Sequence, residues 1–227
     1  MSGQADLRIE RNDDTLRSRV QAKLRDSILD GYFRPGQKLI ERELTELTGV
    51  SRSILREALV HLEARGLIER VSFKGFIVVR LGPDKVREIY ELRSALESFT
   101  AELFTERASE EERRALKQAG EALQRALAGT DLGRIRDATT RWYEVLYRGA
   151  RNSELHRALE PVSDRIFHLR TQSIGDPKRR EASAAEMRAL TEALLGGDAA
   201  EAVDATRRHV EAARDAILAR LEPGDPG

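Results

Sequence analysis

The chain has 227 residues, a length that fits one or two domains with a substantial buried core. Charged residues make up 34% of it, 39 basic side chains balance 39 acidic ones, and aromatic residues amount to 5%. This mixture is typical of soluble helical proteins and argues against disorder and against a β-sandwich. Because the sequence contains no cysteine, disulfides, thiolate metal sites and thiol nucleophiles are excluded.

The N-terminal segment gives no sign of export or membrane insertion. Residues 1–14 are polar, and no apolar run in the sequence approaches the roughly 20 residues that span a bilayer. We therefore expect a cytoplasmic protein that makes no membrane contact.

The first helix is predicted from a regular apolar repeat. Apolar residues recur every four positions from Leu16 to Ile28, which indicates one stripe of an amphipathic helix that stops at Gly31. Residues 34–37, Arg-Pro-Gly-Gln, are typical of a turn because proline fixes φ and glycine adopts positive φ easily.

Two further helices follow this turn. One is expected over about 41–48, with Leu44 and Leu47 facing inward, and Gly49 then allows a sharp corner. The next is expected to begin after Ser51, a good N-cap residue, and to run to about residue 65.

A β-hairpin is predicted after the third helix. Residues 67–71 and 76–81 are apolar and partly β-branched, and a polar segment separates them. Three helices with a tight turn before the last, followed by a hairpin, are the element order of a winged helix-turn-helix.

A projection of the third helix at ~100° per residue separates an apolar face from a polar one. The apolar face, expected in the core, carries Ile54, Leu55, Ala58, Leu59 and Leu62. The opposite face carries Arg52, Ser53, Arg56 and Val60. Two guanidiniums one turn apart on an exposed helix can reach guanine edges or phosphates in a major groove. Arginine pairs are also common on solvated helices, so the order of elements and the predicted wing carry the DNA-binding interpretation.

Three more residues fit a DNA interface. Arg42 is expected to approach the same strand as the third helix, and Lys74 and Gly75 form the predicted wing tip, where a backbone without Cβ can enter a minor groove. Residues 1–80 carry 15 Lys/Arg against 12 Asp/Glu, a net charge of only +3. Because phosphate contacts supply most of the affinity, we expect a dimer that doubles them.

Several motifs of this half resemble the DNA-binding domain of GntR-type bacterial transcription regulators. They are the segments Glu41–Leu47, Gly49–Leu59, Gly66–Ile68 and Lys74–Val78. The resemblance implies that a helix reads the major groove and a wing the minor groove. The DNA-contacting positions that it implies are Arg42, Arg52, Ser53, Arg56 and Gly75. Ile54 stands where many relatives have proline, on the core side of the helix.

From Pro83 onward the sequence predicts about six long helices in an antiparallel bundle. Expected N-caps at Ser109, Asn152, Asp176 and Asp198, together with glycines, divide them into 83–108, 109–129, 131–149, 152–171, 176–196 and 198–221. The expected fold is therefore mostly α, a winged helix-turn-helix followed by a helical bundle. The expected boundaries are a flexible arm at 1–13, a DNA-binding domain at 14–81, a helical domain at 83–221 and a frayed tail at 222–227.

The second half resembles the FCD domain, the helical effector-binding and dimerisation domain of the FadR subfamily of GntR regulators. The resemblance is carried by Tyr90–Glu97, by Trp142 with Asn152, and by Arg207-Arg208-His209-Val210. Many FCD domains bind a divalent metal through one aspartate and three histidines. The matching positions here are Thr139, Tyr143, Met187 and His209. Three of these four are poor ligands for such an ion, so we expect no metal and no other cofactor.

The same positions and one arginine are the candidates for an effector pocket: Arg93, Thr139, Tyr143, Met187 and His209. The resemblance implies that Arg93 faces inward, where it would suit a carboxylate or phosphate, but an intrahelical pair with Glu97 is equally open. Small residues beside His209 either leave room for a ligand or let helices approach closely. We expect Trp142 in the core.

Together these features predict a sequence-specific transcription regulator, and repression is commoner than activation in the resembled family. Its expected partners are a palindromic double-stranded operator, a second copy of the chain, and a small organic-acid or acyl effector. The alternative is a DNA-binding regulator whose pocket is filled by its own side chains and which has no effector. An enzyme is not expected, because the sequence has no Ser/His/Asp arrangement and no Gly-rich phosphate loop.

Overall fold

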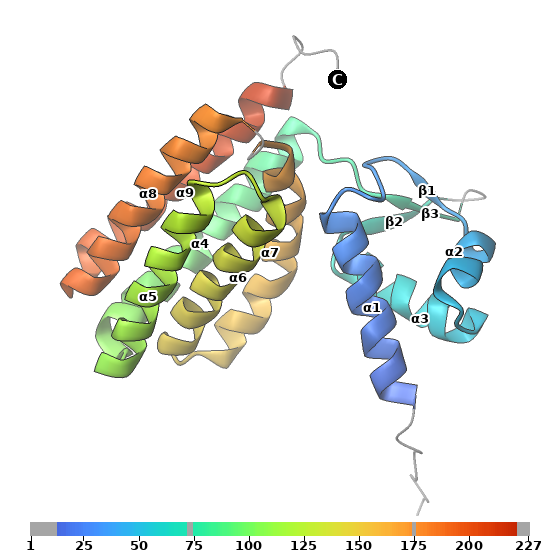
Figure 1. Cartoon of the computed structure of the whole chain (residues 1–227), viewed down its shortest axis with the longest axis horizontal. Coiled ribbons are helices and arrows are strands. Elements are labelled where there is room, and N and C mark those ends of the chain that lie inside the picture. The colour runs from blue at the N-terminus through green and yellow to red at the C-terminus, as the bar shows by residue number, and fades with distance from the viewer. Residues whose placement is uncertain (1–12, 72–74, 174–175, 222–227) are drawn as a thin grey trace, which may run out of the picture. The chain divides into compact units, whose positions relative to one another are not determined.

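The computed structural model describes residues 13–71, 75–173 and 176–221, and it divides the chain into two compact units, Met1–Arg80 and Leu81–Gly227 (Figure 1). The division lies close to Pro83, from which the sequence predicts the long helices of the second half. The predicted arm at 1–13, apart from helical Asp13, and the predicted tail at 222–227 lie outside the described residues. Within the described ranges, no helix is both long and apolar enough to cross a membrane.

The first unit consists of three helices and a small antiparallel sheet. Its elements are α1 (Asp13–Leu29), β1 (Lys38–Leu39), α2 (Glu41–Thr48), α3 (Arg52–Ala64), β2 (Ile68–Val71) and β3 (Gly75–Val78). The strand order is β1-β3-β2, with Leu39 opposite Phe76 and Ile68 opposite Val78. The sequence predicted the β2–β3 hairpin and missed β1, because two residues after a turn are too few to reveal a strand pattern.

The inward position predicted for Leu47 is wrong. Leu44 is buried, whereas Leu47 is 65% exposed. The two residues are three positions apart and hence about 60° apart around the helix, and α2 has only two turns. A helix of this length contacts α3 through one narrow row of residues. Leu47 lies next to that row and not in it.

The second unit is a bundle of six helices within the described residues. They are α4 (Pro83–Arg107), α5 (Glu110–Leu127), α6 (Leu132–Gly149), α7 (Ser153–Ser173), α8 (Pro177–Gly196) and α9 (Ala199–Leu221). The predicted caps at Ser109, Asn152 and Asp176 are confirmed, and Ser109 forms a full capping box with Glu112. In this bundle α4 packs along α9, and α5 packs along both α6 and α8.

Trp142 lies at the centre of the bundle core, as predicted. Its ring is fully buried, and its Nε1 donates a hydrogen bond to Thr191 Oγ1 over 3.0 Å. A buried indole N–H that lacked this partner would lose a hydrogen bond that it makes to water in the unfolded chain. The hydroxyl of Thr191 therefore fixes the orientation of the largest side chain in the core.

Gly149, the last residue of α6, touches the buried ring of Phe104 on α4. A Cβ built at Gly149 would lie 2.5 Å from two ring atoms of Phe104, closer than real Cβ contacts allow. Glycine at this position therefore permits the close approach of α6 to α4. By contrast, a Cβ built at Gly196, the last residue of α8, would meet no atom within 4 Å.

We expect Gly149→Ala to lower the free energy of unfolding of the helical unit by about 1–3 kcal/mol, because the new methyl group overpacks the core against Phe104. The matched control Gly196→Ala should be neutral or slightly stabilising, because alanine has the higher helix propensity and meets open space. Urea unfolding followed by circular dichroism measures both variants. Equal midpoints for the two would contradict the packing argument.

Candidate functional site

The exposed face of α3 is the first candidate site. Ser51 caps the helix by accepting a hydrogen bond from the backbone N–H of Ile54. The projected division of the helix is confirmed, with Leu55, Ala58, Leu59 and Leu62 buried and Arg52, Ser53, Arg56 and Val60 exposed. Ile54 lies at the boundary and is half-buried. The buried leucines thus fix the helix so that its polar face points to solvent.

Two glycines with positive φ shape the surroundings of this face. Gly49 has φ 69° and ψ 14°, and its N–H donates to Thr45 O over 2.9 Å, which ends α2 and begins the turn to α3. Gly75 is exposed, has φ 78°, and begins β3 at the predicted wing. Lys74, the other predicted wing residue, lies outside the described residues.

An ion pair joins α3 to α2 on the same surface. Arg56 Nε donates to Glu41 Oε2 over 2.8 Å, and the Arg56 side chain is still 69% exposed. Sequence reasoning did not assign a role to Glu41, because the two residues are 15 positions apart on different helices. Arg42 and Arg52 are exposed, and within the described ranges their side chains make no hydrogen bond or ion pair. The surface therefore presents two unpaired cations and one oriented guanidinium.

The second candidate site lies inside the bundle, around Arg93. This side chain is 1% exposed. Its Nε donates to Glu97 Oε1 over 2.8 Å, and its Nη2 donates to the Tyr143 hydroxyl over 2.7 Å. Burial opposes the charged form, but the neighbouring carboxylate of Glu97 raises the pKa of Arg93 well above its ordinary value. Arg93 therefore faces inward and forms the intrahelical pair with Glu97, and its role toward an effector stays a prediction.

His209 extends this network toward α8. Its Nε2 lies 3.3 Å from Arg93 Nη2, which can only donate, so this ring nitrogen accepts. The other ring nitrogen, Nδ1, lies 3.0 Å from Glu186 Oε2, where it is placed to donate to this carboxylate. Burial raises the pKa of Glu186, but hydrogen bonds from His209 and Arg179 outweigh it and lower this pKa to about 2. Glu186 is therefore a carboxylate at neutral pH.

Of the five predicted pocket residues, the structure brings Arg93, Tyr143 and His209 together. Thr139 is buried, and its hydroxyl donates to the carbonyl of Ile135 in its own helix. Met187 is 3% exposed and belongs to the apolar core. Sequence reasoning missed Glu186 and Arg179. Their spacing of seven residues, two helical turns, was the one local signal that could have suggested the pair.

Comparisons with known proteins match both units. Residues 16–78 match the model of the bacterial regulatory proteins of the gntR family, and residues 88–212 match the FCD domain. YdhC of Bacillus subtilis (strain 168), an HTH-type transcriptional regulator, is 31% identical over 88% of this chain and 84% of its own length. A protein of Paenarthrobacter nicotinovorans named "Probable D-xylose utilization operon transcriptional repressor" is 28% identical over 86% of this chain and 88% of its own.

The fold has a match among solved structures as well. The structure of E. coli McbR/YncC superposes with a TM-score of 0.77, covers 90% of this chain and 97% of its own, and shares 23% sequence identity. At that identity the likeness concerns the fold alone. The two matched domains, in the order and at the positions of the two units, show that the chain belongs to the GntR family of bacterial regulatory proteins with an FCD domain, and that it is a DNA-binding transcription regulator and not an enzyme.

Proposed function

We propose that this regulator acts as a repressor, binds a palindromic operator as a homodimer through α3, and responds to a small organic-acid or acyl effector. The observation that carries the DNA part is the polar face of α3, where Arg52, Ser53 and Arg56 are exposed while the opposite face is buried. Arg42 on α2 and Gly75 at the wing complete the proposed contact surface. The repressor named among the relatives supports the direction of regulation.

A dimer follows from the modest charge of the DNA-binding unit. Residues 1–80 hold 15 Lys/Arg and 12 Asp/Glu, so one copy can neutralise only a few phosphates. Two copies related by a two-fold axis double the phosphate contacts and present two α3 helices to two half-sites. A palindromic operator is the DNA sequence with the matching symmetry.

We also propose that this chain binds no metal at the position where many FCD domains hold one. The residues present do not fit a hard or borderline divalent ion, because Thr139 donates to its own helix and Met187 offers only a thioether in an apolar core. The guanidinium of Arg93, 3.3 Å from His209 Nε2, faces the lone pair that would bind a cation. Each of these features makes the side chains at this position poor ligands for a divalent metal ion.

One contact in the bundle interior favours a bound effector, and another favours the alternative of a filled pocket. Arg93 Nη1 is buried and has no hydrogen-bond partner within the described residues, so it could donate to a carboxylate or acyl oxygen. The alternative, a filled pocket without an effector, is favoured by the Tyr143 hydroxyl, which already occupies the space beside Arg93 Nη2. An effector that bound both amino groups of the guanidinium, Nη1 and Nη2, would therefore displace the Tyr143 hydroxyl from Nη2.

We expect Arg52→Ala and Arg56→Ala each to weaken operator binding by about 1–3 kcal/mol and to relax base preference, because each removes a guanidinium from the exposed face of α3. The operator is first selected from random duplexes at low salt, and affinities are then measured by fluorescence anisotropy. The control Arg134→Ala removes an exposed arginine from the helical unit and should bind like wild type. Failure to select any duplex would refute the proposed function.

For the effector, we expect a member of a panel of organic acids, sugar acids and acyl-CoA thioesters to raise Tm and change operator affinity. Tyr143→Phe should bind that compound several-fold more tightly, because it removes the hydroxyl that competes for Arg93. Thermal shift and calorimetry measure both effects. If no compound raises Tm, the filled-pocket alternative is supported.

The proposal that no metal binds is tested in the same way. A rise in Tm with Zn²⁺, Ni²⁺ or Mn²⁺ would contradict it.

The low pKa of Glu186 predicts a pH dependence of stability. A carboxyl group whose pKa falls from 4.5 to about 2 on folding stabilises the native state above pH 4.5 and loses that contribution as the pH falls toward 2. Glu186→Gln should therefore lose less stability between pH 5 and pH 3 than wild type, by about 1–3 kcal/mol. Urea unfolding at pH 5 and at pH 3 measures the change in the free energy of unfolding of each protein. The control Glu192→Gln, exposed on the same helix, should keep the wild-type slope.

A further inference from the structure

Arg70, a basic residue outside the predicted set of DNA contacts, lies where α3 meets the β2–β3 hairpin. It belongs to β2, and its side chain is 60% exposed. Its Nη2 lies 3.8 Å from Oε2 of Glu63, near the end of α3. Its Cζ lies over the ring of Phe76 on β3, 4.9 Å from the ring centroid. Arg70 therefore contacts both the helix proposed to read DNA and the hairpin that is predicted to form the wing.

The strand pairing of the hairpin fixes the place of this guanidinium. Arg70 is directly opposite Phe76 in the antiparallel ladder, and Val71 is opposite Gly75. Directly opposite side chains share one face of a sheet, so the Arg70 side chain extends over the Phe76 ring. That ring is buried and cannot move away, and an aromatic face attracts a guanidinium. Because β2 is an edge strand, the held charge still faces water.

The contact with Glu63 leaves the guanidinium able to bind another group. A separation of 3.8 Å is longer than a direct hydrogen bond, and Arg70 donates no hydrogen bond to any other group among the described residues. Glu63 is seven residues, and hence two helical turns, beyond Arg56, so both lie on the same side of α3. An acid on that side would repel the phosphates of a bound duplex. Arg70 offsets this charge and keeps its N–H groups free.

We propose that Arg70 binds a phosphate of the DNA backbone that passes between α3 and the hairpin. This inference rests on the proposed function, with α3 in a major groove and the hairpin in the adjacent minor groove. One sugar-phosphate backbone separates two such grooves, so it must cross the junction of α3 and the hairpin. Arg70 lies at that junction and contacts both sides of it. A planar guanidinium suits a phosphate because two of its N–H groups donate in parallel.

The salt dependence of operator binding tests this contact in the full-length protein. We expect Arg70→Ala to weaken binding about fivefold to thirtyfold and to lower the slope of log affinity against log salt by about 0.9 for each copy on the operator. Arg70→Lys should keep the slope, because it keeps the charge. A repeated selection with Arg70→Ala should return the wild-type operator, since a phosphate contact carries no base information. Fluorescence anisotropy at several salt concentrations measures each slope.

The variant Glu63→Gln separates a phosphate contact from mere compensation of the Glu63 charge. Alone, it should bind the operator at least as tightly as wild type, because it removes a negative charge next to the duplex. Adding Arg70→Ala to it should still weaken binding by a similar factor. If the double variant binds like Glu63→Gln alone, Arg70 acts only through Glu63 and the phosphate contact is wrong.

Arg19→Ala is the matched control, because it removes the same charge from an exposed position of the same unit, on α1, and it should keep the wild-type slope. Unchanged circular dichroism and Tm confirm that each variant is folded. If Arg70→Ala binds with the affinity and slope of wild type, the inference is wrong while the proposed function stands, since wild type still selects an operator. A wild-type chain that selects no duplex would overturn the proposed function itself.

Discussion

The buried guanidinium of Arg93 is the interaction on which the helical unit depends. A charge that is 1% exposed survives in a folded protein only when surrounding groups compensate for the lost water. Here the compensation comes from three helices at once, through Glu97 on α4, Tyr143 on α6 and His209 on α9, and Glu186 on α8 then binds His209. The network therefore fixes the mutual packing of these four helices, because a helix that moved away would leave a buried charge without its partner.

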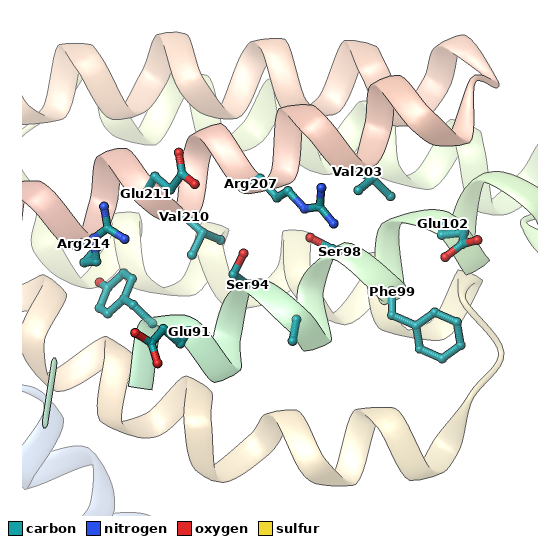
Figure 2. Close-up of a pocket in the computed structure, with 12 residues that line it drawn as sticks. Glu91, Ser94, Ser98, Phe99, Glu102, Val203, Arg207, Val210, Glu211 and Arg214 are labelled. Carbon is teal, nitrogen blue, oxygen red and sulfur yellow. The ribbon is translucent and has the colours of Figure 1, made fainter. Parts of the chain in front are cut away.

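The helix that carries Arg93 has a second, outer face. Arg93 points from α4 into the interior, while Phe99 and Glu102 line a pocket on the outer side of α4 (Figure 2). An effector oxygen that bound Arg93 would change the partners of a group on which the position of α4 depends. A proposed effector would thus act on a helix whose packing depends on the Arg93 network.

Local sequence patterns predicted the elements and the faces of the helices, and they missed contacts between distant elements. Ser109 and Asp176 were recognised as caps because capping depends on residues at most three positions apart. The buried and exposed faces of α3 followed from its periodicity. The pair between Arg56 and Glu41 and the one between His209 and Glu186 were not predictable, because periodicity indicates which side faces the core and not which polar group arrives from another helix.

The protein has no net charge, so the positions of its basic residues decide whether it can bind DNA. With 39 basic and 39 acidic residues, the protein has no overall attraction to DNA, so its affinity must arise from where the cations are placed. Many arginines are already engaged by acids of the same chain, as Arg93 is by Glu97 and Arg179 by Glu186. Arg42 on α2 and Arg52 on the exposed face of α3 make no ion pair within the described ranges. In the proposed homodimer, two copies present this small set of available cations to one duplex, so affinity for DNA would depend on the geometry of the two copies.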